Sequence, residues 1–125
     1  MVRTRTVVRA AVTLVVVAAV GLAVLPLSLA LDEMAMPPAS SLPALPDGAR
    51  VTAEGMGCGS GGCWVELTVD APAGMSGEEL AAAVTPGRSE CAFQSLLDLR
   101  RVCASAMDVE AGSAQFSVQY DRWVD

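Results

Sequence analysis

Four cysteines carry the most reactive side chains of this chain, and they occur as two pairs in its second half. Cys58 and Cys63 bracket a Gly-Ser-Gly-Gly stretch, and Cys91 and Cys103 flank a short segment further along. Four cysteines permit three pairings. Proximity in sequence favours Cys58 with Cys63 and Cys91 with Cys103. Loops closed in this way would stabilise the folded chain by about 2 and 3 kcal/mol on the chain-entropy model.

A cysteine pair in so tight a loop could instead be redox-active, because strain raises the reduction potential of a disulfide. No Cys-x-x-Cys motif and no neighbouring His or Lys is present to lower a thiol pKa. We therefore favour structural disulfides, and a thiol-disulfide protein or sensor using Cys58 and Cys63 is the alternative. A four-cysteine zinc site is disfavoured, because the spacing differs from zinc ribbons and exported thiols usually oxidise.

The chain contains no histidine, the usual general base near neutral pH and the commonest metal ligand. Its absence excludes Ser-His and Cys-His nucleophile pairs and zinc sites that use His. Two carboxylates on neighbouring strands could form an acid and base pair for glycoside hydrolysis, although such groups are usually solvated. We expect no catalytic residue, no metal and no cofactor. The carboxylates considered are Glu54, Glu66, Asp70, Asp108 and Glu110.

The stretch from Gly57 to Gly62 satisfies G-x-G-x-x-G, the dinucleotide-binding pattern. That pattern works by directing a helix N-terminus at a pyrophosphate, whereas the residues that follow here are strand-like. We interpret the glycines as a tight hairpin turn closed by a disulfide.

Three side chains are candidate contacts for a partner. Arg100 and Arg101, next to Asp98, could bind an anion, although adjacent arginines on a strand are more often salt-bridged surface. Trp64 lies on the polar side of its strand, where it could cap the core edge or anchor a partner. Beyond residue 31 the chain has five arginines against fourteen acidic residues, a net charge of −9, which argues against nucleic acid or anionic lipid as a partner.

The N-terminus predicts a membrane segment. Residues 1–9 contain Arg3, Arg5 and Arg9 without an acid, and residues 10–31 carry no charge. A helix of that length reaches ~33 Å, enough to span a hydrocarbon core of about 30 Å. Basic residues before the segment and acidic ones after it place the N-terminus in the cytoplasm and the rest outside the cell membrane.

The alternative is a cleaved signal peptide. Pro26 precedes the small-x-small triplet Ser28-Leu29-Ala30, which resembles a cleavage site, so the domain could be secreted after cleavage near Ala30. The apolar stretch is long for such a peptide, which favours a retained signal-anchor and a single-pass protein. Both topologies export the domain.

The remaining chain divides into a Pro-rich segment and a domain. Residues 32–48 hold four prolines, typical of an extended stalk. Residues 49–125 predict an α+β domain, with an antiparallel sheet covered by one short helix in the order ββαββ. Residues 89–99 are either irregular or a second short helix around Phe93, Leu96 and Leu97. The expected elements are strands at 50–56, 63–70, 100–110 and 114–123, and a helix opened by the capping box Ser76-Gly77-Glu78-Glu79.

The motif Cys58-Gly-Ser-Gly-Gly-Cys63-Trp64, followed by a strand, a capped helix and a second cysteine pair, resembles uncharacterised small membrane-anchored or secreted proteins of actinobacterial cell envelopes. The resemblance covers the outer domain only and implies its location and its disulfides, but no activity. We expect a non-enzymatic, extracytoplasmic module, tethered by residues 10–31, that binds an unidentified envelope protein or ligand.

Overall fold

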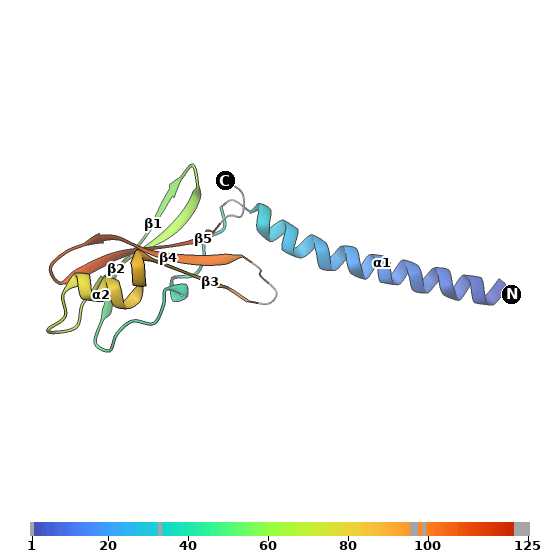
Figure 1. The fold of residues 1–125 in the computed structure, drawn as a ribbon. Helices are drawn as coiled ribbons and strands as arrows, with labels where there is room; N and C mark the ends of the chain where they lie inside the picture. Colours follow the sequence, from blue (N-terminus) through green and yellow to red (C-terminus); the bar gives the residue numbers. More distant parts are fainter. Residues whose placement is uncertain (1, 33, 96–97, 99, 122–125) are drawn as a thin grey trace. The chain divides into compact units, whose positions relative to one another are not determined.

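The computed structural model describes residues 2–32, 34–95, 98 and 100–121. By its internal contacts the chain divides into two compact units, Met1–Asp32 and Glu33–Asp125. The first unit is one helix, and the second is the disulfide-closed domain (Figure 1).

Helix α1 runs over Val2–Leu31 and includes Pro26. Its part from Thr4 to Leu29 has a mean hydropathy of 2.6, and none of it is buried in the structure. A helix that is apolar all round and exposed to water on every side would be unfavourable, so this helix requires a lipid or protein environment. Its length and composition fit one membrane span or a signal sequence near the N-terminus.

The domain is built on one antiparallel sheet of five strands in the order β1-β2-β5-β4-β3. Every neighbouring pair of strands is antiparallel. The strands are β1 (Arg50–Gly59), β2 (Gly62–Asp70), β3 (Ser89–Phe93), β4 (Arg101–Val109) and β5 (Ser113–Asp121).

Alternation of side chains defines the two faces of the sheet. In β2, Val65, Leu67 and Val69 are buried, and each is paired with a buried residue of β5. The residues between them are only half-buried and point to the other face. The strands predicted at 63–70 and 114–123 correspond to β2 and β5, and one face of the sheet holds the core.

Helix α2 (Gly77–Val84) covers one end of the core face. Its N-terminus is the predicted capping box: Ser76 Oγ accepts from the Glu79 amide at 3.2 Å, and the Glu79 carboxylate accepts from the Ser76 amide at 2.8 Å. Leu80 and Val84 are buried against the sheet. These contacts confirm the predicted α+β class, with a short helix over an antiparallel sheet.

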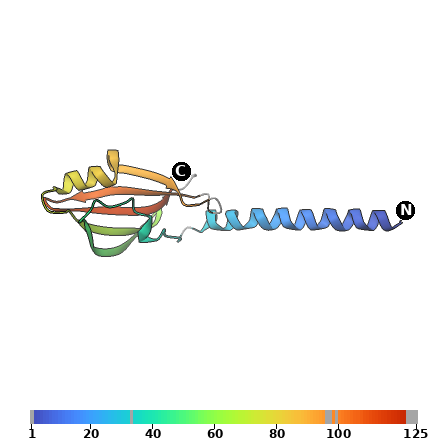
Figure 2. The same ribbon diagram turned by 90° about the horizontal axis from the view of Figure 1, so that it is seen from below.

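The Pro-rich segment also covers the core face. Pro37 is fully buried, and Leu42 packs against both hydrophobic clusters of the sheet, whereas Leu45 packs against the cluster beneath α2. Figure 2 shows this segment crossing the strands beside α2. The predicted stalk is therefore wrong for residues 37–45, because their apolar side chains gain more from covering the sheet than from solvation.

A further correction concerns a strand that the sequence did not predict. Ser89–Phe93 is strand β3, paired with β4, so the order is ββαβββ instead of ββαββ. Phe93, around which a helix was considered, lies in this strand, and the described residues of 89–99 contain no helix. The strand was concealed because all five of its residues are exposed and show no alternation. Leu96, Leu97 and Trp123, which also entered the prediction, lie outside the described residues.

Candidate functional site

Both disulfides are cross-strand links, with the pairing that sequence proximity favoured. Cys58–Cys63 joins β1 to β2, and Cys91–Cys103 joins the edge strand β3 to β4. In each pair the two cysteines are register partners with Cα atoms 4.1 Å apart. They therefore fasten both edge strands to the sheet, which is a structural role.

The glycine-rich motif forms the turn of the β1–β2 hairpin. Gly59 pairs with Gly62, whose φ of 112° is accessible to glycine but rarely to other residues. Strand β2 follows directly, so no helix N-terminus is directed at this loop. The hairpin interpretation is confirmed, and the motif has no geometry for a dinucleotide phosphate.

Trp64 is held in one orientation by its neighbours. Its indole Nε1 donates to Glu66 Oε1 at 2.8 Å. Its ring lies against the backbone of Gly57, where a Cβ would overlap the indole, and a Cβ at Gly59 would be 3.5 Å from the ring. The half-buried indole thus packs on the glycines of β1. Such packing of an aromatic ring over strand glycines replaces contacts that their missing side chains cannot make.

Trp64 belongs to the face of the sheet opposite the core, which we call the open face because no described helix or loop packs on it. Its central row runs over all five strands and contains small side chains and one carboxylate. Trp64 and Gln119 lie on one side of that row, and Thr68 and Gln115 on the other. By strand register the row is Gly55, Glu66, Ser117, Ser105 and Ser89.

The polar side chains of the open face make few hydrogen bonds within the domain. Ser105 donates to Ser89 at 3.1 Å, and Glu66 accepts from Trp64. The side chains of Gln115, Ser117 and Gln119 make no hydrogen bond to any residue that the structure describes, although Gln115 and Ser117 are half-buried. These side chains are therefore available for a ligand.

Two depressions lie beside the Pro-rich segment on the core face. One, of about 450 Å³, is bordered by Ser41, Pro43 and the β3 residues Glu90 and Phe93. The other, of about 390 Å³, is bordered by Leu42, Leu45, Val51 and Glu54. Each is shallow and has a single carboxylate in its lining, Glu90 in the first and Glu54 in the second, so neither brings together two groups for acid-base chemistry.

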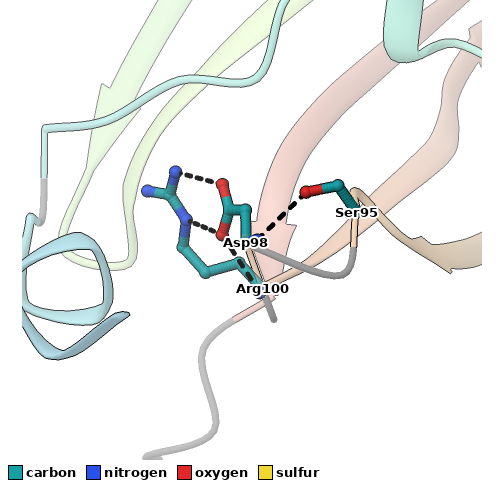
Figure 3. A network of polar contacts seen from close by, with 3 residues as sticks. All are labelled: Ser95, Asp98 and Arg100. Atoms are coloured by element: carbon teal, nitrogen blue, oxygen red, sulfur yellow. Dashed lines mark hydrogen bonds and ion pairs between the residues drawn. The ribbon is translucent and has the colours of Figure 1, made fainter. Parts of the chain in front are cut away.

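The two arginines proposed as partner contacts face carboxylates. Arg100 Nε and Nη2 donate to the two oxygens of Asp98 at 2.8 and 2.6 Å, and its guanidinium lies 3.8 Å from the centroid of the Tyr120 ring. Figure 3 shows this pair, with Ser95 accepting from the Asp98 amide. Arg101 pairs with Asp121. Both arginines thus form ion pairs at the end of the sheet. An anion that bound to either one would have to displace a carboxylate.

Hydrogen bonding from the Arg100 side chain holds the pKa of Asp98 below its ordinary value of 3.8, against an opposing effect of burial. Because the folded state binds this proton less tightly than the unfolded state, the stabilisation is complete above the unfolded pKa and is lost as pH falls through the folded one. We expect Asp98→Asn to lower the free energy of unfolding at pH 7 by about 1–3 kcal/mol. Its stability should also fall less steeply than that of the wild type below pH ~4.

Urea unfolding between pH 7 and pH 2 measures both effects. Asp47→Asn is the matched control, because Asp47 is exposed in the turn before β1 and has no ion pair among the described residues. Identical pH profiles for Asp98→Asn and the wild type would contradict the assignment.

The strand carboxylates are dispersed over the sheet. Glu54 is the register partner of buried Leu67 and lies on the core face, whereas Glu66 lies on the open face beside Trp64. Asp70 is paired with Arg50 at the end of β2. Among the described residues no three His, Cys, Asp or Glu side chains are grouped as metal ligands would be.

The chain was also compared with known proteins. No family model, no curated protein and no solved structure matches it. Roles for its residues must therefore be argued from its own geometry.

Sequence reasoning identified Trp64 but missed the surface around it. The signal was present in two alternating patterns: glycine at positions 55, 57 and 59, and Gln-Ser-Gln at positions 115, 117 and 119. From the sequence, the glycines from Gly57 on were interpreted only as a hairpin turn, and the Gln-Ser-Gln pattern was assigned no role. The sequence did not show which strands are neighbours in the sheet, because β5 lies next to β2 but is distant from it in sequence.

Proposed function

We propose that the chain is a single-pass protein of a bacterial cell membrane whose domain is a non-enzymatic, extracytoplasmic binding module. One observation carries the proposal: a domain fastened by two disulfides directly follows a helix long and apolar enough to cross a membrane. Disulfides persist in oxidising compartments and are rare in the cytosol. The domain and the helix therefore support the same location.

The orientation follows from the charges on either side of the helix. Arg3, Arg5 and Arg9 precede the apolar span, and Asp32 and Glu33 follow it. Short basic flanks are retained on the cytoplasmic side. The N-terminus is then cytoplasmic and the domain lies outside.

A binding role is supported by what the domain presents to solvent. Its open face offers a fixed indole and several amide and hydroxyl groups without partners among the described residues. These groups can recognise a ligand. Ser117 is the register partner of Glu66, but that carboxylate accepts from Trp64 and makes no described hydrogen bond to the Ser117 hydroxyl that would activate it. Recognition without turnover is the chemistry that this arrangement supports.

Protease treatment of intact cells, followed by intact-mass analysis of the membrane fraction, tests the location. We expect the domain to be cleaved from outside and the untreated protein to retain residues 1–30. Ala30→Leu is the matched control, because it removes the small residue that a signal peptidase requires. A wild-type protein that lacks residues 1–30 while this variant keeps them would establish the secreted alternative, and a protected domain would overturn the proposal.

Differential alkylation of the same cells separates the binding role from the redox alternative. Cys58 is exposed and Cys63 is buried, so a reducing thiol would reach Cys58 first. We expect all four cysteines to resist alkylation until the protein is denatured and reduced. A substantial reduced fraction confined to Cys58 and Cys63 would favour the thiol-disulfide alternative.

A further inference from the structure

We propose that the open face binds a neutral glycan chain, laid across the strands with a sugar ring against Trp64. The inference deepens the proposed function by naming the class of ligand. It rests on the shape of this face, on its polar side chains and on its charge.

The shape of the open face fits an extended polymer. Nothing in the central row is longer than a hydroxymethyl group except Glu66, so the row is a low floor between two lines of larger side chains. Trp64 and Gln119 stand on one side of it, and Thr68 and Gln115 on the other. Five strands at a spacing of about 4.8 Å make the floor ~19 Å long. A chain several sugars long could lie along it.

The polar groups fit a ligand rich in hydroxyls. The amides of Gln115 and Gln119 each both donate and accept, as does the Ser117 hydroxyl, and none of them is committed to a described residue. A sugar hydroxyl has the same dual character. The Glu66 carboxylate adds a strong acceptor beside the indole.

Trp64 supplies the apolar surface. The C–H face of a sugar ring stacks on a flat aromatic side chain, and a ring that is already fixed loses little entropy when it binds. Contact with Gly57 and the bond to Glu66 fix this indole before any ligand arrives. It is also the one large aromatic side chain among the residues that flank the central row.

Charge and composition exclude the main competitors. No arginine lies in the central row, and Arg101, which is on the same face four residues along β4 from Ser105, is paired with Asp121. The chain after residue 31 has a net charge of −9, so a polyanion would be repelled. A protein partner usually requires several apolar anchors at the centre of its interface. Beside the central row the open face has one, Trp64, and the exposed Phe93 lies at its margin, four residues along β3 from Ser89. A neutral, hydroxyl-rich chain is the class that remains.

Titration calorimetry on the full-length protein in detergent micelles tests the proposal without depending on its topology in cells. The probes are two neutral tetrasaccharides, one of β-1,4-linked glucose and one of β-1,4-linked N-acetylglucosamine. We expect at least one of them to bind saturably at micromolar to millimolar concentration. Trp64→Ala should weaken that binding by at least about tenfold, as for other aromatic anchors.

Two glycine variants test the role of the indole without removing any ligand-binding group. Gly57→Ala places a Cβ where the indole now lies and must displace the ring, whereas Gly59→Ala adds a Cβ at ordinary van der Waals distance. We expect Gly57→Ala to weaken binding severalfold and Gly59→Ala to leave it unchanged. Because Trp64 is present in both, a difference between them reports its position.

Ser117→Arg provides a variant that leaves Trp64 and its contacts intact. A long cationic side chain in the central row should abolish binding, whereas Met56→Ala, on the core face of the β1–β2 hairpin, should not alter it. Urea unfolding of each variant confirms that it is folded. Binding that is unaffected by both Trp64→Ala and Ser117→Arg would overturn the proposal, as would the absence of binding of both tetrasaccharides to the folded wild type.

Discussion

Replacing Phe116 with alanine is expected to lower the free energy of unfolding of the disulfide-closed domain by about 3–5 kcal/mol. Phe116 has no exposed surface and is the register partner of Leu67 in β2 and of Ala106 in β4. It packs in the cluster that α2 covers with Leu80 and Val84. Removing its ring leaves a cavity between the helix and the three central strands, which cannot all move inward to fill it.

The loss is large relative to what such a domain can spare, because stabilities of 5–15 kcal/mol are typical of natural domains. Urea unfolding of the full-length protein in micelles, followed by tryptophan fluorescence with the disulfides kept intact, measures it. Phe93→Ala is the matched control: Phe93 is 61% exposed on the edge strand β3, and its removal should change stability by less than about 0.5 kcal/mol. Equal losses for both variants would mean that the core has been assigned wrongly.

Several elements of this fold were predictable because their signals are local. Helix α2 is opened by Ser76 and Glu79, three residues apart, and β2 is marked by the alternation of Val65, Leu67 and Val69. The pairing of the cysteines followed from loop length. Each of these signals lies within a dozen residues, where chain geometry decides the outcome.

Other elements were not predictable because the decisive contacts are distant in sequence. Strand β3 has no pattern of its own and forms because β4 offers a free edge and Cys91 is bonded to Cys103. The open face exists as one surface because β5 lies between β2 and β4, an arrangement that no local sequence pattern indicates. Composition likewise misassigned the Pro-rich segment, since prolines indicate an extended chain but do not say whether that chain lies in solvent or on a sheet.

The Pro-rich segment gives the second large effect that we expect. Substituting residues 37–45 in the full-length protein with a Gly-Ser sequence of equal length should lower the free energy of unfolding by about 3–5 kcal/mol, because it removes the apolar cover that Leu42 and Leu45 provide. A free stalk would predict no change, since flexible linkers contribute nothing to the stability of a domain. Urea unfolding of the two proteins therefore distinguishes a cover from a stalk.

Point variants determine whether the effect comes from side-chain contacts or from chain length. Leu42 packs against both clusters of the core, whereas Ala44, two residues later, is exposed. Leu42→Asp should therefore destabilise the domain by at least about 2 kcal/mol, because the carboxylate must either be buried unpaired or lift the segment off the sheet. Ala44→Asp should be nearly neutral. If both substitutions are neutral, the segment does not cover the core in solution, and the domain begins near Ala49.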